Sequence, residues 1–579
     1  MIARVTNGAE LLCNTLESLG VEHVFGVPGT QNVLLYDALR RSKIRSVLAT
    51  HELGASFMAN GYYRASGRVA PLITIPGPGF TYALTGLAEA LHDSAAVLHV
   101  VGQPAERSGK KYLFQSLDQV GIAGPLVKRV YCVRQVDEIP QMVAEAYGLA
   151  LSGEPGPVLL QWSKDALNSF PACPFEQPSL KTAGGPLPSD SLVEEAATLL
   201  GAARRPILLV GQGAAGDAEL VKQLAELIVS PVFTTVSGRG VLPEDHPLAL
   251  GFDFNRGDVH VLNDMIRQSD CVVSLGCKLT HPGTGGFELE LPSDRLIRVD
   301  TSKEVLGANY TARLAILGSV EAVLGRLFPA VQRLPRVSIG GWTHDEIEDW
   351  KKRLRMARST VVLEPSVHGV TLKTAASFFA ALRRILPRNG IVVTDSGLHQ
   401  GLVRRHFDVL APRGLILPSD LQSMGFGLPA AIGAKLAAPD RPVVVVLGDG
   451  GFAMSGMELL TAVREKIPLT VIVFNDGRLN LIRLQQFAEF GRSESVDLLN
   501  PDFGAFADAV GAQYALVDGN AEEVLRNAVG STRVTLVEVL VGDSPEIHLI
   551  RAKAFTRETA RRALGPGVVR RIKNWLRRD

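Results

Sequence analysis

The sequence predicts an α/β protein of three domains, each built on a mostly parallel sheet flanked by helices. Short apolar runs alternate with amphipathic segments along nearly the whole chain, and the runs at 443–447 and 469–474 are unbroken, as in strands buried on both faces. Two stretches interrupt this alternation. Residues 170–188 carry five prolines and a Gly pair, and residues 328–369 read as a second connection around a charged, helix-like segment. The predicted domains are residues 1–170, 189–330 and 366–545, followed by a basic tail over 546–579.

Each domain contains apolar runs that are expected to be strands. They are RSVLATHE, APLITIPG and AAVLHVVG in the first domain, PILLVG, CVVSLG and RLIRVD in the second, and GIVVTDSG with the two unbroken runs in the third. Amphipathic segments separate these runs, so we expect helical crossovers between parallel strands.

The composition is that of a large globular protein with no global preference for nucleic acid. Hydrophobic residues make up 46% of the 579 residues, and 60 basic against 59 acidic residues give a formal charge of +1. No apolar run reaches the roughly 18 residues that cross a bilayer, so no transmembrane segment is expected. The cysteines show no ligand spacing, and their odd number without a signal peptide predicts free thiols in the reducing cytoplasm. They are Cys13, Cys132, Cys173, Cys271 and Cys277.

Two similar phrases, GDG at 448–450 and NDG at 475–477, follow the unbroken runs of the third domain. Each phrase taken alone is typical of a turn. The apolar residues between the phrases recur at helical spacing, at Met457, Leu460, Val463 and Ile467. This pattern predicts strand, helix, strand, with the two strands as neighbours, so Asp449 and Asp476 are expected at the same edge of the sheet.

Two carboxylates that converge with no base beside them repel each other unless a cation lies between them. Mg²⁺, a hard ion that prefers oxygen ligands, fits Asp449 and Asp476. Mg²⁺ also takes phosphate as a ligand, and Gly448, Gly450 and Gly451 leave room for a diphosphate to approach the backbone at a helix start. The residues alone leave the alternative open that both Asp are ordinary loop and cap residues.

A G-x-G-x-x-G pattern in the second domain, within PILLVGQGAAGDAEL at 206–220, matches the dinucleotide fingerprint. The acidic residue expected about 20 residues further on is missing, because that region reads PVFTTVSGRG. Tight packing of a strand against a helix is the alternative explanation, and a nicotinamide dehydrogenase ranks last among the functions considered.

Several motifs appear in the order found in one enzyme family. The segment GDGGFAMSGMELLTAVREKIPLTVIVFND resembles the thiamine diphosphate motif, in which GDG is followed some way later by an Asn-Asn or Asn-Asp pair. The sequence therefore resembles thiamine diphosphate-dependent enzymes of the acetolactate synthase and pyruvate oxidase branch, whose domains are called pyrimidine, central and diphosphate domains. The other matching motifs are GVEHVFGVPGT at 20–30, THELGASFMANGYYRASG at 50–67, FQSLDQVG at 114–121, GRGVLPEDHPLALG at 238–251 and SMGFGLPAAIGAKLA at 423–437.

The resemblance implies a Mg²⁺ site at Asp449, Asp476 and the main-chain carbonyl of Arg478. It also implies that thiamine diphosphate is the cofactor. The implied cofactor-binding residues are Glu52, His399, Gln400, Ser423, Met424, Gly448, Asp449, Gly450, Gly451 and Asn475.

Glu52, in THELGA, matches the glutamate that contacts N1′ of the aminopyrimidine ring. A carboxylic acid there can protonate N1′, so that the 4′-nitrogen can take the proton from C2 of the thiazolium ring. Read without the resemblance, Glu52 is an acidic residue in the first turn of a helix, which is worth about 0.3–1 kcal/mol. With the resemblance, the catalytic role is preferred.

Met424 matches the bulky side chain wedged beneath the cofactor, and the alternative is a core methionine. Gln115 matches a position near the reacting carbon, where an amide can orient substrate. The alternative is a glutamine in a surface loop. His399 and Gln400 match cofactor-proximal positions at the entrance to the third domain.

The family arrangement implies a homodimer or homotetramer with the active site between subunits, so that Glu52 and Asp449 of one site come from different chains. The implied reaction decarboxylates a small 2-oxo acid and ligates the product to an acceptor. Three departures from family patterns limit the substrate prediction. Gln485 stands at about the position of the tryptophan in the acceptor pocket of acetolactate synthases. GCKLTHPGTGGF at 276–287 replaces their element near FAD, which argues against FAD, and SGKKYLFQSLD at 108–118 lacks the His-His pair of pyruvate decarboxylases.

The tail is strongly basic, with ten Lys or Arg from Arg551 onward against Glu558 and Asp579. It predicts an anionic partner, either a CoA phosphate, as in the similar oxalyl-CoA decarboxylase and 2-hydroxyacyl-CoA lyase branch, or an acidic membrane surface. The alternative is a terminal helix that docks on the protein through Trp575. An acyl-CoA lyase or decarboxylase is therefore the second function considered. A non-catalytic, cofactor-binding regulatory homologue is the third, and Glu52 together with the metal pair speaks against it.

Overall fold

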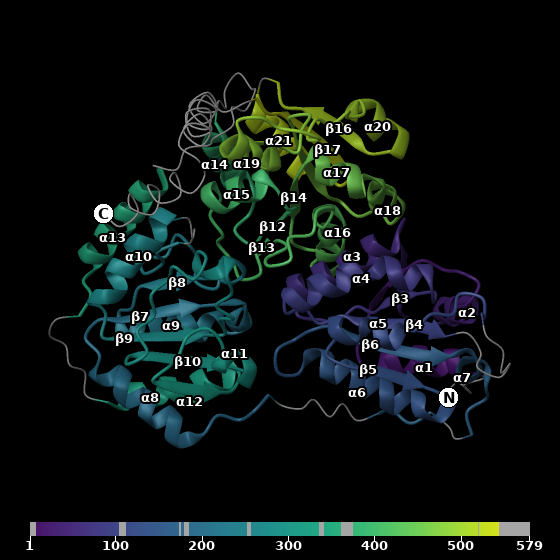
Figure 1. Ribbon diagram of the computed structural model, residues 1–579, viewed down its shortest axis with the longest axis horizontal. Coiled ribbons are helices and arrows are strands. Elements are labelled where there is room, and N and C mark those ends of the chain that lie inside the picture. Colours follow the sequence, from purple (N-terminus) through teal and green to yellow (C-terminus); the bar gives the residue numbers. More distant parts are fainter. Residues whose placement is uncertain are drawn as a thin grey trace, which may run out of the picture.

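The computed structural model of the chain describes residues 7–103, 112–172, 175–178, 185–251, 256–334, 341–359, 374–518 and 520–542. These residues form three domains, each around its own sheet (Figure 1). Adjacent strands are parallel in all three sheets, which confirms the predicted fold class. In Figure 1 the N-terminal domain lies at the lower right, the central domain at the lower left and the C-terminal domain at the top.

The N-terminal domain has a six-stranded sheet in the order β2-β1-β3-β4-β6-β5. Its strands β4 and β6 are almost wholly buried, which explains their mainly apolar sequences. The strands are β1 (His23–Gly26), β2 (Arg45–Leu48), β3 (Leu72–Thr74), β4 (Leu98–Gln103), β5 (Val130–Val133) and β6 (Val158–Ser163). The helices are α1 (Gly8–Ser18), α2 (Val33–Arg41), α3 (Glu52–Ser66), α4 (Pro78–His92), α5 (Gln119–Ala123), α6 (Ile139–Leu151) and α7 (Lys164–Asn168).

The central domain has a five-stranded sheet in the order β11-β10-β9-β7-β8. Its strands are β7 (Pro206–Val210), β8 (Val232–Thr234), β9 (Cys271–Leu275), β10 (Leu296–Asp300) and β11 (Leu314–Leu317). Its helices are α8 (Asp190–Ala202), α9 (Ala218–Ile228), α10 (Arg256–Gln268), α11 (Lys303–Gly307), α12 (Val320–Arg333) and α13 (His344–Ser359).

Helix α13 is the charged segment that the sequence placed in a connection between domains. Its Ile347, Trp350 and Leu354 join the hydrophobic core of the central domain. The charged residues on the other faces of α13 concealed this apolar stripe in the sequence. Because the stripe joins the core, the central domain extends beyond the predicted end at residue 330.

The C-terminal domain has a six-stranded sheet in the order β13-β12-β14-β15-β17-β16. Its strands are β12 (Ile391–Thr394), β13 (Leu415–Ile416), β14 (Val443–Gly448), β15 (Thr470–Asn475), β16 (Gln513–Leu516) and β17 (Thr535–Leu540). Its helices are α14 (Ala375–Ile385), α15 (Leu398–His406), α16 (Gly427–Ala437), α17 (Asp449–Ser455), α18 (Leu459–Arg464), α19 (Asn480–Phe490), α20 (Phe503–Val510) and α21 (Ala521–Val529).

The crossover between β14 and β15 is helical, as predicted, but it is divided into two short helices. A 3₁₀ turn over Gly456–Glu458 separates α17 from α18. Met457, one of the apolar residues at helical spacing, is 53% exposed, whereas the Glu458 side chain is buried. Glu458 accepts hydrogen bonds from the backbone N–H groups of Thr50 and His51, both at 3.2 Å, so the turn lets a carboxylate reach the N-terminal domain.

Helices α3 and α16 pack closely and join the N-terminal domain to the C-terminal domain (Figure 1). Two glycines make this approach possible. A Cβ at Gly61 would lie 2.0 Å from the carbonyl oxygen of Ala430, and a Cβ at Gly433 would lie 1.9 Å from that of Met58. Neither position has room for a side chain.

Cys13, Cys271 and Cys277 are buried free thiols, as predicted, and Cys173 lies outside the described residues. Among the described residues, no helix is long and apolar enough to cross a membrane. The predicted tail over 546–579, with Arg551 and Trp575, lies outside the described residues.

Candidate active site

The ends of β14 and β15 bring the two predicted metal-binding acids together. Gly448 is in register with Phe474, so Asp449 and Asp476 follow at the same edge of the sheet. Both line an open cavity of about 670 Å³. The strand-helix-strand reading of this segment therefore placed the two acids correctly relative to each other.

Asp449 is held by three hydrogen bonds. Its Oδ1 accepts from the backbone N–H of Gly450 at 2.8 Å, and its Oδ2 accepts from the N–H of Gly477 and from Nδ2 of Asn500, each at 2.7 Å. These donors fix the orientation of this buried side chain.

Asp476 lies in a less favourable environment for a charge. Burial, followed by the negative charge of Asp449, raises its pKa to about 7. Its Oδ1 accepts from the backbone N–H of Arg478 at 3.2 Å. A cation between the two acids would relieve this repulsion, which is the condition that predicted a metal here.

The donor set fits Mg²⁺ together with a diphosphate. In the described part of the chain, no three or more His, Cys, Asp or Glu side chains are grouped so that they could hold a metal ion. Two carboxylates and one carbonyl, that of Arg478, leave positions for water and phosphate oxygens, which is how Mg²⁺ is commonly bound. The Arg478 carbonyl also accepts the N–H of Asn480 at 2.9 Å.

Glycines form the part of the cavity next to Asp449. A Cβ at Gly450 would lie 2.6 Å from Cδ2 of Leu479 and 3.4 Å from Cε of Met424. Gly448, Gly450 and Gly451 all line the cavity, and so does Met424. The backbone is thus open to a ligand in the place where the sequence predicted a diphosphate, and the Met424 side chain reaches toward it.

His399 lines the cavity as a neutral imidazole. Burial lowers its pKa to about 4, and its Nε2 lies 3.0 Å from the carbonyl oxygen of Asp395. A carbonyl only accepts, so Nε2 carries the proton and Nδ1 is left as an acceptor. Nδ1 would be 3.2 Å from a Cβ at Gly448, which places it beside the predicted diphosphate loop.

Other predicted residues lie near the cavity but are not among the residues that line it. Asn475 turns its amide away, with Nδ2 donating to Oε1 of Glu538 at 2.6 Å. Gln400 is buried and donates to the carbonyl of Pro418 at 3.2 Å. Ser423 contacts the N-terminal domain through its backbone N–H.

Three polar residues of this region were not predicted. Asn500 donates to both Asp449 and Asn475, at 2.7 and 2.8 Å. Glu538 links Asn475 to Tyr514, because its Oε2 accepts a hydrogen bond from the Tyr514 hydroxyl at 2.6 Å. Asp395, at the end of β12, accepts from the N–H of Gly425 and of Gly427, both at 3.0 Å. Only Asp395 had a signal in the sequence, because it follows a strand as Asp449 does.

The predicted catalytic residues lie in the N-terminal domain, and neither lines this cavity. Glu52 begins α3, with a Cβ at Gly79 falling 3.0 Å from its Oε1. Gln115 lies beside Gly77 with a left-handed φ of 60°, which is strained for a residue other than glycine. Its Oε1 is buried without a hydrogen-bond partner among the described residues.

A second, larger cavity of about 1550 Å³ lies at the junction of the three domains. It is bordered by Gly213 and Gly216 of the G-x-G-x-x-G segment and by Lys278. A Cβ at Gly211 would lie 2.1 Å from the carbonyl of Gly276, so this glycine is explained by close packing. Carboxylates outnumber cationic side chains in the lining, and whether a flavin binds here stays a prediction. The acids are Asp93, Glu154, Asp217, Asp300, Glu321 and Asp420, against Lys278, Arg404 and Arg413.

The chain matches three family models in sequence. They are the N-terminal TPP (thiamine pyrophosphate, that is, thiamine diphosphate) binding domain of thiamine pyrophosphate enzymes over residues 6–122, their central domain over 193–327 and their C-terminal TPP binding domain over 395–539.

Curated relatives agree with these matches. The large subunit of acetolactate synthase isozyme 1 of Escherichia coli (strain K12) is 34% identical over 83% of each chain. The acetolactate synthase of Mycobacterium bovis is 35% identical over 87% of this chain and 82% of the relative. The probable acetolactate synthase large subunit of Methanocaldococcus jannaschii is 31% identical over 94% of this chain and 93% of the relative. The chain belongs to the thiamine diphosphate-dependent enzymes, in the acetolactate synthase-like branch of that family.

Proposed function

We propose that this carboligase decarboxylates a small 2-oxo acid and joins the remaining fragment to the carbonyl carbon of a second small molecule. The observation that carries the proposal is the pair of buried acids at the ends of β14 and β15, beside a glycine-lined cavity, in a chain whose relatives are named acetolactate synthases. An acyl-CoA substrate was predicted from the tail, which lies outside the described residues. No observation favours that alternative.

We propose that Asp449, Asp476 and the carbonyl of Arg478 bind Mg²⁺, and that Gly448, Gly450 and Gly451 border the diphosphate. Bound thiamine diphosphate supplies the electron sink that cleavage of a C–C bond beside a carbonyl requires. The chain provides the rest. Met424 packs against the cofactor, and neutral His399 offers an acceptor nitrogen beside Gly448.

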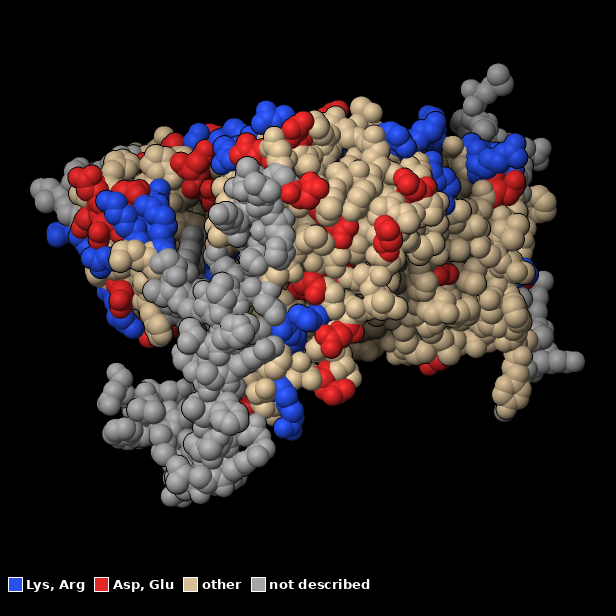
Figure 2. All heavy atoms as spheres, turned by 90° about the horizontal axis from the view of Figure 1, so that it is seen from above, with Lys and Arg blue, Asp and Glu red and all other residues tan. Residues whose placement is uncertain are grey.

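The proposed proton donor is Glu52, which gives a proton to N1′ of the aminopyrimidine. Glu52 does not line the cavity of its own chain, which supports a site completed by a second copy of the chain. We propose a homodimer, or a homotetramer made of two such dimers. In each dimer, Glu52 of one chain and Asp449 of the other serve one cofactor. Large exposed apolar side chains support a partner surface, among them Tyr82, Phe114 and Met454, at 52, 69 and 60% exposure. Figure 2 shows a broad face with few charged side chains on the side where the N-terminal domain lies.

Subunit complementation tests this arrangement. Glu52→Gln and Asp449→Ala chains are each expected to be inactive alone. A hybrid dimer of the two has one intact site, which combines Glu52 from the second chain with Asp449 from the first. Random exchange should therefore restore about a quarter of the wild-type activity. A chain with both substitutions, mixed with either single variant, is the control that should restore none. Absence of recovery, after mass spectrometry has shown that subunits exchange, would contradict the proposal.

The reaction is tested with purified enzyme, Mg²⁺ and thiamine diphosphate. Pyruvate and larger 2-oxo acids are supplied alone and in pairs, and CO₂ and the ligated product are measured. We expect CO₂ and a hydroxy-oxo acid product in a fixed ratio. Gln485, at about the position of the tryptophan in the acceptor pocket of acetolactate synthases, is exposed on α19. This experiment therefore also identifies the preferred acceptor. Absence of both products with every pair would contradict the proposed reaction.

We also propose that the enzyme works in the cytoplasm. Cys13, Cys271 and Cys277 are free thiols, and burial raises their pKa to about 12, so these thiols resist oxidation. Cell fractionation checks this location.

A further inference from the structure

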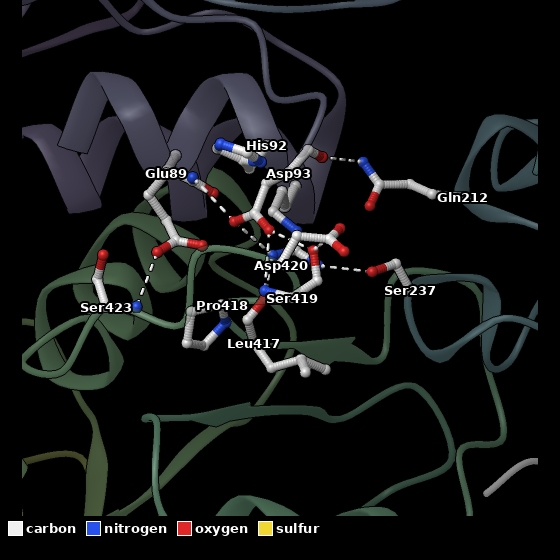
Figure 3. A network of polar contacts seen from close by, with 12 residues as sticks. Glu89, His92, Asp93, Gln212, Ser237, Leu417, Pro418, Ser419, Asp420 and Ser423 are labelled. Carbon is white, nitrogen blue, oxygen red and sulfur yellow. Dashed lines mark hydrogen bonds and ion pairs between the residues drawn. The ribbon is translucent and has the colours of Figure 1, made fainter. Parts of the chain in front are cut away.

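The loop over residues 417–425 carries Met424 and is anchored on both sides of it by a buried carboxylate. On one side, the backbone N–H of Ser423 donates to Oε2 of Glu89 at 2.9 Å (Figure 3). On the other, the N–H of Gly425 donates to Oδ1 of Asp395 at 3.0 Å. Met424 is therefore the residue between two fixed peptide groups.

The two anchors come from different domains. Asp395 follows β12 in the same domain as Met424, whereas Glu89 lies near the end of α4 in the N-terminal domain. Asp93, just past the end of α4, holds the same loop, since its Oδ1 accepts from the N–H and the hydroxyl of Ser419 at 3.1 and 2.6 Å. Arg64 forms a buried ion pair with Asp93 at 3.0 Å and also donates to the carbonyl of Leu417. Figure 3 shows Glu89 and Asp93 beside the loop at the domain boundary.

The loop has a conformation that needs such anchors. Gln422 has a φ of 63°, although it is not glycine, and Gly425 has a φ of 81°. The left-handed conformation costs conformational energy at Gln422, because Gln422 is not glycine. Contacts from outside the loop must therefore hold this shape. The shape matters for the cavity, because Cε of Met424 lies 3.4 Å from where a Cβ at Gly450 would be.

Glu89 is an unusual residue to bury for packing alone. Its side chain is fully buried, and Oε1 has no hydrogen-bond partner among the described residues. Burial and the charge of Asp93 raise its pKa to about 7, against the opposing effects of the Ser423 hydrogen bonds and of Arg64. An apolar residue at position 89 would avoid the cost of burying a carboxyl group. What distinguishes Glu89 from a core residue is that its Oε2 accepts a hydrogen bond from the N–H of Ser423.

We propose that Glu89 is a positioning residue for Met424, so that the N-terminal domain of a chain sets the shape of the cofactor cavity in the C-terminal domain of the same chain. This proposal deepens the proposed function. It rests on that function in one respect, which is that Met424 is expected to pack against thiamine diphosphate. The position of Met424 in the free protein does not depend on that expectation, which separates the two claims experimentally.

The experiment is methyl NMR of protein labelled in its methionine methyl groups, without cofactor. The chain has 8 Met, and Met424→Leu identifies the Met424 signal by its disappearance. Glu89→Leu removes the acceptor and should move or broaden this signal, whereas Glu89→Gln keeps an acceptor oxygen and should leave it near its wild-type position. In wild type the signal should also shift with pH around 7, and this shift should be smaller in Glu89→Gln, in which Asp476 and Asp395 still titrate. The wild-type titration requires no variant to fold.

Glu458→Gln is the matched control, because Glu458 is also a buried carboxylate that holds backbone amides across the same two domains. It should leave the Met424 signal unchanged. As a second readout, calorimetry should show binding of thiamine diphosphate with Mg²⁺ that is about five-fold weaker in Glu89→Leu, the effect of one lost hydrogen bond.

Two results would overturn the positioning role. One is a Met424 signal that is the same in wild type and Glu89→Leu. The other is a Glu89→Gln variant that disturbs the signal as much as Glu89→Leu, which would show that an acceptor oxygen at this position does not hold Met424 in place. If the cofactor failed to bind wild type at all, the proposed function would fail, while the NMR result on Glu89 would stand.

Discussion

The first and last sheets of the molecule have the same strand order, but among the described residues only the last presents acids at the ends of its third and fourth strands. In both, the order along the sheet is second, first, third, fourth, sixth and fifth strand of the domain. In the C-terminal domain these strand ends carry Asp449 and Asp476. In the N-terminal domain the third strand, β3, is followed by Ile75, Pro76 and Gly77.

At the start of the helix after the second strand, it is the N-terminal domain that carries the acid. In the N-terminal domain it is α3, which begins with Glu52, and in the C-terminal domain it is α16, which begins with Gly427. The two helices pack against each other at Gly61 and Gly433. One architecture thus serves two tasks: it offers the proposed metal-binding edge in one domain and a helix-start acid in the other. Topology provides the positions, and a few side chains decide the chemistry.

The largest expected effect comes from removing an acid at the metal-binding edge. Asp449→Ala should abolish retention of thiamine diphosphate, because the diphosphate loses the ion that joins it to the protein. Calorimetry with and without Mg²⁺ measures this. Asp508→Ala, which removes an exposed carboxylate on α20, is the control and should bind normally. Cofactor affinity in Asp449→Ala that equals wild type would remove the distinction drawn between the two sheets.

A smaller effect is expected from the residue that orients Asp449. Asn500→Ala leaves both acids in place but removes the donor shared by Asp449 and Asn475. Substitutions of this kind typically weaken metal binding about 10–100-fold. The apparent affinity for Mn²⁺, measured by electron paramagnetic resonance, reports this without activity. Leu499→Ala changes the fully exposed neighbour and should have no effect. If the two variants bound Mn²⁺ equally, Asn500 would have no part in the metal site.

The smallest effect concerns stability at the boundary between the two domains. The pKa of Glu89 is raised from 4.5 to about 7, so the folded state binds its proton more tightly than the unfolded state. This contribution to stability is complete below pH 4.5 and is lost as pH rises through about 7, by at most about 3 kcal/mol. Glu89→Gln has no such loss, so its thermal midpoint relative to wild type should be higher at pH 8 than at pH 5. A difference between the two proteins that does not vary with pH would contradict the raised pKa.

The sequence supported the parts of this account that depend on local pattern. Unbroken apolar runs with helical crossovers predicted parallel strands, and parallel neighbours predicted that Asp449 and Asp476 would meet. The pattern did not show the 3₁₀ turn over Gly456–Glu458, which interrupts the predicted helix and leaves the Met457 side chain exposed.

The remaining site residues depend on contacts that no local pattern encodes. Asn500 lies 51 residues from Asp449, and Glu89 lies 334 residues from Ser423. Nothing in the apolar helix LAEALHD indicates that its glutamate reaches another domain. The role of Glu52 came from the resemblance alone, because its proposed partner cavity belongs to a second chain.

The most direct test of the account is the exchange of the C2 proton of bound thiamine diphosphate into deuterated water, followed by NMR after acid quench. Wild type is compared with Glu52→Gln, which keeps the size of the side chain but cannot protonate N1′. We expect exchange to slow about 10²–10⁴-fold, the usual contribution of general acid-base catalysis, with cofactor and Mg²⁺ still bound. This measurement follows the proposed proton transfer itself and requires no knowledge of the substrate. Exchange in Glu52→Gln as fast as in wild type would show that Glu52 is not the activating acid.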